Sequence, residues 1–348
     1  MTFIKNTFST LLFVSVLSSC IAQSKIVLPS RDAILESMTE NHVPAVGVSV
    51  IENNKLSDVL MFGNISTQSP APVNTIFNIA SLTKPIVSML TLRLVSDGKW
   101  NLDEPLSNYW VDPDVAGDPR HKLITTRHVL SHQSGLPNWK GHEPGGKLSF
   151  AFEPGTQWKY SGEGFEYLRQ ALEHKLNTPI EVLADSLIFK PFGMNDTRFY
   201  WDRTMDSTRF AHRYHADGTP FEWETWTTAN PSNLLLTTVG DYGKFGIEVI
   251  KGTGLSKSMR EEMIKVQARP NSDREFGLGW SLVKGLSNGE YAVMHTGRNP
   301  GINTIIILLP KSKRGIIVFT NGEQGDVVYK KIISEAFSTG KEIIEQMK

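Results

Sequence analysis

The hydrophobic pattern of this chain has strand character at both ends. Residues 46–51 and 60–62 are apolar runs separated by a polar turn at 52–55, which predicts a pair of adjacent strands. Before them, residues 30–41 carry apolar side chains at the spacing of an amphipathic helix. Apolar runs bounded by turn residues return after Phe276 and predict four more strands: 278–283, 291–295, 304–309 and 315–320.

The middle of the chain has helical periodicity instead. Loops rich in Gly, Pro, Asp and Trp separate the predicted helices, and a last helix is predicted over about 326–345. Strands at both ends with helices between them predict an α+β fold. Its sheet lobe comprises about 30–85 and 252–348, and a helical lobe of about 86–251 is inserted into it. The helices of the middle region are predicted over four segments: 125–131, 162–176, 180–188 and 239–251.

The first 19 residues have the pattern of an export signal. Lys5 precedes a short apolar run at 11–17, which is too short to span a bilayer as a helix. The sequence Leu-Ser-Ser-Cys at 17–20 resembles a lipobox, the bacterial signal in which the cysteine is lipidated. Cys20 is the only cysteine of the chain, so it cannot form an internal disulfide. We therefore expect an exported protein, anchored to the bacterial cell envelope by a lipid on Cys20. Residues 20–29 would form a tether, and the alternative is an ordinary cleaved signal with an incidental cysteine.

Composition and charge narrow the function classes. The 348 residues include 36 basic and 36 acidic side chains, and the first 19 residues contain one lysine and no acid. A nearly neutral mature chain has no electrostatic reason to bind nucleic acid. A hydrophobic content of 40% is typical of a globular domain with a substantial core. We therefore expect no nucleic-acid partner, and the lipid anchor would make the membrane a partner.

Ser81 and Lys84 are the most informative polar residues. The apolar, helix-compatible run at 86–94 predicts a helix, and the S-x-x-K spacing at its start places a hydroxyl and an amine on one helix face, one turn apart. A neutral lysine amine can take the serine proton and so make the serine a strong nucleophile. The same spacing begins at Ser96, Ser281 and Ser338, but those serines lie in a turn, a strand and a glycine-containing segment.

Two further motifs follow in the chain: Y-S-G at 160–162, before a predicted helix, and H-T-G at 295–297, at the end of a predicted strand. The order S-x-x-K, Y-S-x, H-T-G resembles the serine β-lactamase and penicillin-binding-protein superfamily. Within it, the chain is most similar to the branch related to class C β-lactamases, D-aminopeptidases and family VIII esterases. The run Leu-Ser-His-Gln-Ser-Gly-Leu-Pro at 130–137 also looks like a helix-to-loop signature of that branch.

This resemblance, which covers about 43–320, implies both a fold and a chemistry. The fold would be β-lactamase/transpeptidase-like, with an antiparallel sheet flanked by N- and C-terminal helices and an inserted helical lobe. Ser81 would form an acyl-enzyme that water then hydrolyses. Tyr160 would share the proton with Lys84 and protonate the leaving group, and the backbone N–H groups of Ser81 and Arg298 would form the oxyanion hole. This chemistry needs no metal and no organic cofactor.

The resemblance also implies four substrate-binding residues: Gly162, His295, Thr296 and Gly297. The second motif often ends in asparagine, whose amide holds an acylamino group of the substrate, and Gly162 has no such amide. The third motif often begins with lysine, a fixed cation near the substrate carboxylate, whereas a histidine of ordinary pKa, about 6.5, is mostly neutral at pH 7. We expect Gly297 to leave room for substrate backbone along the strand edge.

These two departures predict weak or no β-lactamase activity. The expected function is a serine hydrolase for esters, amides or peptides of small acyl or D-amino-acid type. Two alternatives are enzymes: a peptidase like a D-aminopeptidase or D-Ala carboxypeptidase, and a true β-lactamase. A third alternative, from another class, is an envelope binding or sensor lipoprotein without turnover.

The other histidines and the tryptophans are interpreted as packing residues. His128 and His132 have the i, i+4 spacing of zinc ligands, but no glutamate follows His128 as the zinc-protease motif requires. His212 and His215 lie in a polar loop without an obvious third ligand. The tryptophans of the middle loops are expected to pack those loops, with one or two lining a cleft: Trp139, Trp158, Trp201, Trp223 and Trp226.

Overall fold

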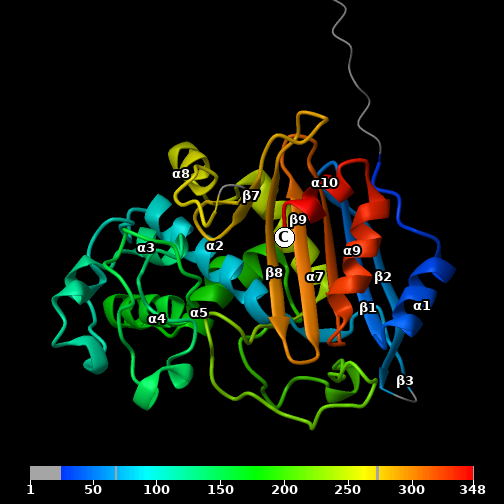
Figure 1. Ribbon diagram of the computed structural model, residues 1–348, viewed down its shortest axis with the longest axis horizontal. Coiled ribbons are helices and arrows are strands. Elements are labelled where there is room, and N and C mark those ends of the chain that lie inside the picture. Colours follow the sequence, from blue (N-terminus) through cyan, green and yellow to red (C-terminus); the bar gives the residue numbers. More distant parts are fainter. Residues whose placement is uncertain (1–24, 67–68, 272–273, 348) are drawn as a thin grey trace, which may run out of the picture.

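An eight-stranded antiparallel sheet forms the centre of the molecule (Figure 1). The computed structural model describes residues 25–66, 69–271 and 274–347. The strand order is β3-β2-β1-β10-β9-β8-β7-β6, so the first and last thirds of the chain share one sheet. Its strands are β1 (Ala45–Glu52), β2 (Lys55–Ser66), β3 (Ser69–Pro70), β6 (Glu275–Phe276), β7 (Ser281–Val283), β8 (Ala292–Asn299), β9 (Ile302–Leu309) and β10 (Arg314–Thr320).

Side-chain alternation along the central strands divides the core into two layers. On β9, Ile305 and Ile307 pack with the helices of one face, whereas Ile306 and Leu308 pack with those of the other. The first face is covered by α1 (Arg31–Glu40), α9 (Gly325–Ala336) and α10 (Gly340–Glu345). The opposite face is covered by α7 (Val239–Lys251), and α2 (Thr83–Ser96) belongs to the same hydrophobic cluster. The result is a sheet buried between two helical layers.

The remaining helices gather beside the sheet (Figure 1). They are joined by long loops and by short turns of 3-10 helix, and a small sheet of β4 (Ile76–Asn78) and β5 (Leu236–Thr238) lies next to the start of α2. A π-helical turn at Asp185–Phe189 continues one of these helices. They are α3 (Thr126–Leu130), α4 (Glu163–Leu176), α5 (Ile180–Ala184), α6 (Lys190–Phe192) and α8 (Lys257–Met263). This arrangement confirms the predicted α+β architecture with an inserted helical region.

The predicted border between the two lobes was wrong at α7. We assigned residues 239–251 to the helical lobe, but α7 packs on the sheet. A Cβ at Gly243 would lie 2.5 Å from Ser49 Oγ, and one at Gly246 would lie 3.0 Å from Ile51 Cδ1. The two glycines therefore let the helix approach β1 closely. An apolar helix face predicts burial, but not which surface buries it.

Several other elements differ from the prediction. The helix predicted over about 326–345 is divided into α9 and α10, because Phe337 between them is extended. The chain then packs closely on α9, since a Cβ at Gly340 would lie 2.0 Å from the Ile333 carbonyl oxygen. The strand predicted to close at residue 295 continues to Asn299, and the polar helix α8 was not predicted. The described end of the predicted tether is already attached to the domain, since Val27 N–H donates to Ala336 O at 2.9 Å.

The predicted export signal at 1–19 and Cys20 lie outside the described residues. Within the part that the structure describes, none of the helices has the length and hydropathy needed to cross a bilayer.

Candidate active site

Ser81 lies on a 3-10 turn, Ala80–Leu82, that leads directly into α2. The preceding Ala80 has a φ of 48°, in the left-handed region that residues with a Cβ rarely adopt. Two hydrogen bonds hold it there: Ala80 N–H donates to Asn78 Oδ1 at 2.8 Å, and Thr83 Oγ1 donates to Ala80 O at 2.7 Å. Backbone strain of this kind persists only where the surroundings fix it, and it is concentrated at functional sites.

The turn is also held from the sheet and from α7. Thr304 on β9 donates its hydroxyl proton to Ile79 O at 2.9 Å, and Tyr242 on α7 donates to Leu82 O at 2.7 Å. Both contacts are buried. The residues on either side of Ser81 are therefore anchored, which fixes the direction of its side chain.

Lys84 is fully buried, and its amine contacts the Ser81 hydroxyl. Its Nζ lies 3.3 Å from Ser81 Oγ and donates to Ser232 O at 2.8 Å. No carboxylate among the described residues forms an ion pair with it. Burial therefore lowers the pKa of Lys84 from 10.5 to about 7. A large fraction of the amine is neutral at pH 7 and can accept the serine proton, as the S-x-x-K spacing predicted.

Tyr160 meets the same pair from the loop before α4. Its hydroxyl hydrogen-bonds Ser81, and the Lys84 Nζ lies 4.7 Å from the centre of its ring. Burial raises the pKa of the Tyr160 phenol above its ordinary value. The phenol therefore stays protonated where the amine is partly neutral, so the amine is the better proton acceptor of the two and the phenol the better proton donor.

His295 is buried beside this triad. Its Nδ1–H donates to Thr296 O at 2.8 Å, and burial together with the charge of Lys84 lowers the pKa of His295 to about 3. The imidazole is therefore neutral across the physiological pH range. This agrees with the expected neutrality and strengthens it, because the cause is burial and not an ordinary pKa.

Gly297 has a different role from the one expected. A Cβ at Gly297 would lie 2.3 Å from Ile79 O and 3.2 Å from Leu82 N, so it would collide with the nucleophile turn. The glycine thus allows β8 to lie against that turn. A side chain at this position would meet the turn and would not extend into a space for substrate. Strand β7 pairs with β8 only from Ala292 to Met294, so the edge of β8 beyond Met294 has no β7 partner.

Gly162 also has a packing reason. A Cβ there would lie 2.6 Å from Asn138 O and 3.1 Å from Asn138 Oδ1. The missing family amide therefore cannot be restored at this position without moving the backbone. Asn138 lines the cleft itself, and the sequence analysis missed it, although it directly follows the 130–137 signature.

A cleft of about 350 Å³ opens over Ser81. Trp139 and Trp158 line it, as expected for one or two of the loop tryptophans, whereas Trp201 and Trp223 pack with Phe210 away from it. The other lining residues, besides Ser81, combine the predicted motifs with new positions: Asn138, Tyr160, Arg274, Phe276, Ser281, His295, Thr296, Arg298 and Asn299. Thr296 and Arg298 thus line the cleft that contains Ser81.

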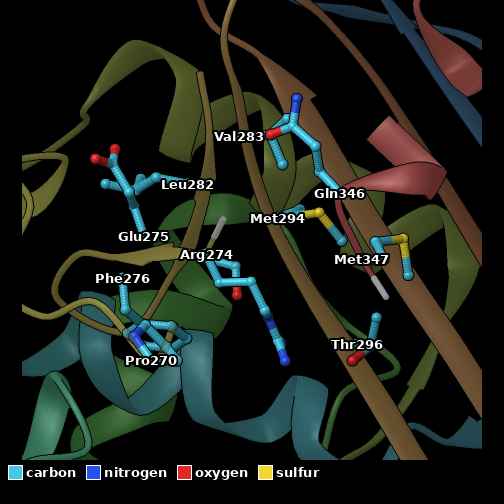
Figure 2. A pocket seen from close by; sticks show the side chains of 11 residues that line it. Pro270, Arg274, Glu275, Phe276, Leu282, Val283, Met294, Thr296, Gln346 and Met347 are labelled. Carbon is cyan, nitrogen blue, oxygen red and sulfur yellow. The ribbon is translucent and has the colours of Figure 1, made fainter. Parts of the chain in front are cut away.

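A second cavity adjoins the cleft, between the β6–β7 segment and the C-terminal residues Gln346 and Met347 (Figure 2). Arg274 and Thr296 line both cavities. No carboxylate of the described residues forms an ion pair with Arg274. No motif marked Arg274 in the sequence. The described part of the chain has no group of His, Cys, Asp or Glu residues arranged to hold a metal ion.

Comparison with known proteins agrees with this geometry. The family model described as Beta-lactamase matches residues 31–337. A penicillin-binding protein of Bacillus subtilis (strain 168) is 26% identical over 79% of this chain and 67% of its own length. Esterase EstB of Burkholderia gladioli is 31% identical over 43% of this chain and 44% of its own length. The chain thus matches only part of these relatives.

Solved structures share the fold at lower identity. A D-amino acid amidase from Ochrobactrum anthropi SV3 superposes with a TM-score of 0.72 at 23% identity, covering 87% of this chain and 97% of its own. A class C β-lactamase superposes with a TM-score of 0.73 at 19% identity, covering 88% of this chain and 96% of its own.

Proposed function

Because the chain belongs to the Beta-lactamase family, we propose that it is a serine hydrolase that forms an acyl-enzyme on Ser81. Its substrates would be esters, amides or peptides of small acyl or D-amino-acid type. The observation that carries this proposal is the buried amine of Lys84, with its lowered pKa of about 7, in contact with the Ser81 hydroxyl. In a binding lipoprotein without turnover, nothing would compensate for the unfavourable desolvation of this buried amine.

The proposed reaction has two halves. Lys84 takes the Ser81 proton while Ser81 Oγ attacks the acyl carbon, and the N–H groups of Ser81 and Arg298 stabilise the oxyanion. When the tetrahedral intermediate collapses, Tyr160 gives its proton to the leaving group and recovers one from protonated Lys84. Water then attacks the acyl-enzyme with the same groups working in reverse.

The substrate preference rests on the neutral His295 and on Gly162. Neither supplies the cation or the amide that a carboxylated β-lactam would meet in the family pattern, so we infer weak or no β-lactamase activity. The esterase and amidase relatives support esters and amides as the preferred classes.

A second candidate is a peptidase that releases a carboxylated residue. The observation in its favour is Arg274, which has no ion pair with a carboxylate of the described residues and lines the cleft together with the exposed Arg298. Two cations in the lining of the cleft suit a C-terminal carboxylate of the substrate.

We also propose, from the N-terminal sequence, that the chain is exported and lipid-anchored through Cys20. Its place of work would then be the cell envelope, on the outer side of a bacterial membrane.

The test of the main proposal uses one purified sample. A fluorophosphonate probe should label the wild-type protein and fail to label Ser81→Ala, which should also lose all turnover because no other group can form the acyl-enzyme. Ser96→Ala is the matched control, since Ser96 has the same S-x-x-K spacing but bonds to Leu92 O at 2.9 Å, away from the cleft. Residual turnover of more than a few per cent in Ser81→Ala would contradict the assignment.

The substrate test follows on the same sample. We expect kcat/KM for p-nitrophenyl butyrate to exceed that for benzylpenicillin. A D-Ala-terminated peptide turned over faster than the ester would favour the peptidase, and faster penicillin hydrolysis would show a true β-lactamase.

A further inference from the structure

His132 contacts the chain on both sides of Tyr160. Its carbonyl oxygen accepts from Lys159 N–H at 2.9 Å, and its ring Nδ1 accepts from Ser161 N–H at 3.2 Å. One residue therefore bonds the backbone immediately before and immediately after the tyrosine. His132 itself has a φ of 58°, which turns its backbone and ring toward this segment at the end of α3.

The ring of His132 also supports the ring of Tyr160. The two ring centres are 4.2 Å apart, the shortest aromatic contact that the tyrosine makes among the described residues. Phe276 and Phe165 lie against the imidazole, with ring centres at 5.0 Å and 5.7 Å. The imidazole is fully buried in this group, so it cannot change its orientation without repacking it.

The imidazole is held as one tautomer. Nδ1 can accept from Ser161 only when it carries no proton, so the single hydrogen of the neutral ring lies on Nε2. That Nε2 is buried and has no hydrogen-bond partner among the described residues. Leaving a buried donor unpaired is unfavourable, and a phenyl ring would avoid the penalty while filling the same space. The position therefore needs the acceptor at Nδ1 and not only an aromatic ring.

We propose that His132 is a positioning residue that orients the hydroxyl of Tyr160 toward Ser81. It acts through the two backbone hydrogen bonds and the ring contact, and it does not touch the substrate. This inference rests on the proposed function, because it assigns a purpose to the Tyr160 orientation. It replaces the interpretation of His132 as a helix-packing residue.

The consequence concerns the leaving group. A weakly basic leaving group such as p-nitrophenolate departs without a proton, whereas an alkoxide must be protonated as it leaves. A misplaced Tyr160 therefore harms alkyl esters much more than aryl esters. Damage to Ser81 or to the fold would lower the turnover of both to the same extent.

The experiment compares ethyl butyrate with p-nitrophenyl butyrate, which share one acyl group. His132→Phe keeps an aromatic ring and removes the Nδ1 acceptor. We expect its kcat/KM for ethyl butyrate to fall at least about tenfold more than its kcat/KM for p-nitrophenyl butyrate, within the range of general-acid effects. The ratio of the two kcat/KM values isolates the acylation step, because both esters give the same acyl-enzyme and therefore share the deacylation step.

Two further variants complete the test. His132→Asn retains an acceptor near Nδ1 and tolerates the left-handed backbone, so it should recover part of the ethyl butyrate activity. His128→Phe is the matched control, because His128 lies on α3, one turn before His132, but bonds Leu123 O at 3.1 Å and not the 159–161 segment. Its two kcat/KM values should stay within about twofold of wild type.

The outcomes separate this inference from the proposed function. If Tyr160→Phe shows the same leaving-group selectivity and His132→Phe adds nothing in the Tyr160→Phe background, His132 acts through Tyr160. Equal loss on both esters in His132→Phe, or no loss on either, would overturn the inference. If His132→Phe fails to fold, the ratio of the two esters in His132→Asn decides in the same way. If Tyr160→Phe itself shows no selectivity, the proposed acid role of Tyr160 is wrong.

Discussion

The burial of Lys84 controls both chemistry and stability at the residue scale. Its pKa is about 7 in the folded protein and 10.5 when it is free in solution. The base must be neutral, so kcat/KM should fall as the pH is lowered through about 7. Between pH 7 and 10.5 the unfolded chain binds more protons at this position than the folded one. Stability should therefore rise with pH across that window and be independent of this group below it.

Lys84→Met tests directly how much the burial of the Lys84 amine lowers the stability of the folded protein. The variant should lose all hydrolysis, because the base is gone, and yet gain about 1–3 kcal/mol in the free energy of unfolding at pH 8. Urea denaturation at pH 8 and at pH 10 measures it, and the gain should shrink at the higher pH. Lys251→Met is the control, because Lys251 is exposed and its one ion pair among the described residues is with Glu248. A destabilised Lys84→Met would show that its hydrogen bonds outweigh its desolvation.

Gly162 is a second residue whose surroundings limit the effect of a substitution. Gly162→Asn would supply the family's missing amide, but its Cβ would lie 2.6 Å from Asn138 O. We expect a loss of about 1–3 kcal/mol in stability and no gain in benzylpenicillin hydrolysis, even when it is combined with His295→Lys. Thermal melting and a penicillin assay check both parts. A soluble double variant with raised penicillin turnover would show that the backbone relaxes around residue 138.

At the scale of elements, the site depends on how closely β8 approaches the nucleophile turn. The turn belongs to the segment before α2, and β8 belongs to the C-terminal part of the sheet. Gly297 sets the distance between them, since a Cβ there would meet backbone atoms of Ile79 and Leu82. The oxyanion hole that we propose draws one N–H group from each element, so this contact also sets the hole's width.

Gly297→Ala should therefore damage catalysis more than folding. We expect kcat to fall about 100-fold, because small displacements of preorganised donors are costly, and stability to fall by about 1–3 kcal/mol. Steady-state kinetics and urea denaturation measure the two effects. Gly117→Ala is the matched control, since a Cβ there meets no atom within 4 Å. Full activity in Gly297→Ala would exclude the tight contact.

At the scale of the whole molecule, the N-terminal segment ends beside the C-terminal helices. Ile26 N–H donates to Glu52 Oε1 at 2.7 Å, and Val27 bonds to the end of α9. A lipid on Cys20 would thus leave only a few residues between the membrane and the folded domain. The proposed anchor would hold the domain close to the membrane surface.

Cys20→Ser tests the anchor in the bacterial host. The wild-type protein should sediment with membranes, and the variant should be released or misprocessed, because no thiol accepts the lipid. Fractionation followed by mass spectrometry of the N-terminus measures both. A wild-type N-terminus downstream of residue 20 without a lipid would refute the anchor, and Ser19→Ala is a control that keeps the cysteine.

Interactions between residues close together in the chain explain what could be predicted from the sequence alone. Periodicity identified most helices and strands, because side-chain alternation and helical spacing are properties of neighbouring residues. The S-x-x-K spacing pointed to Ser81 and Lys84, because it places a hydroxyl and an amine one helical turn apart, and the family resemblance added Tyr160. The tertiary structure alone decided that α7 packs on the sheet, that Gly297 and Gly162 serve packing, and that Arg274 and Asn138 line the cleft. It also decided that Lys84 and His295 have lowered pKa values, since burial depends on residues more than 100 positions away in the chain, such as Ser232 for Lys84.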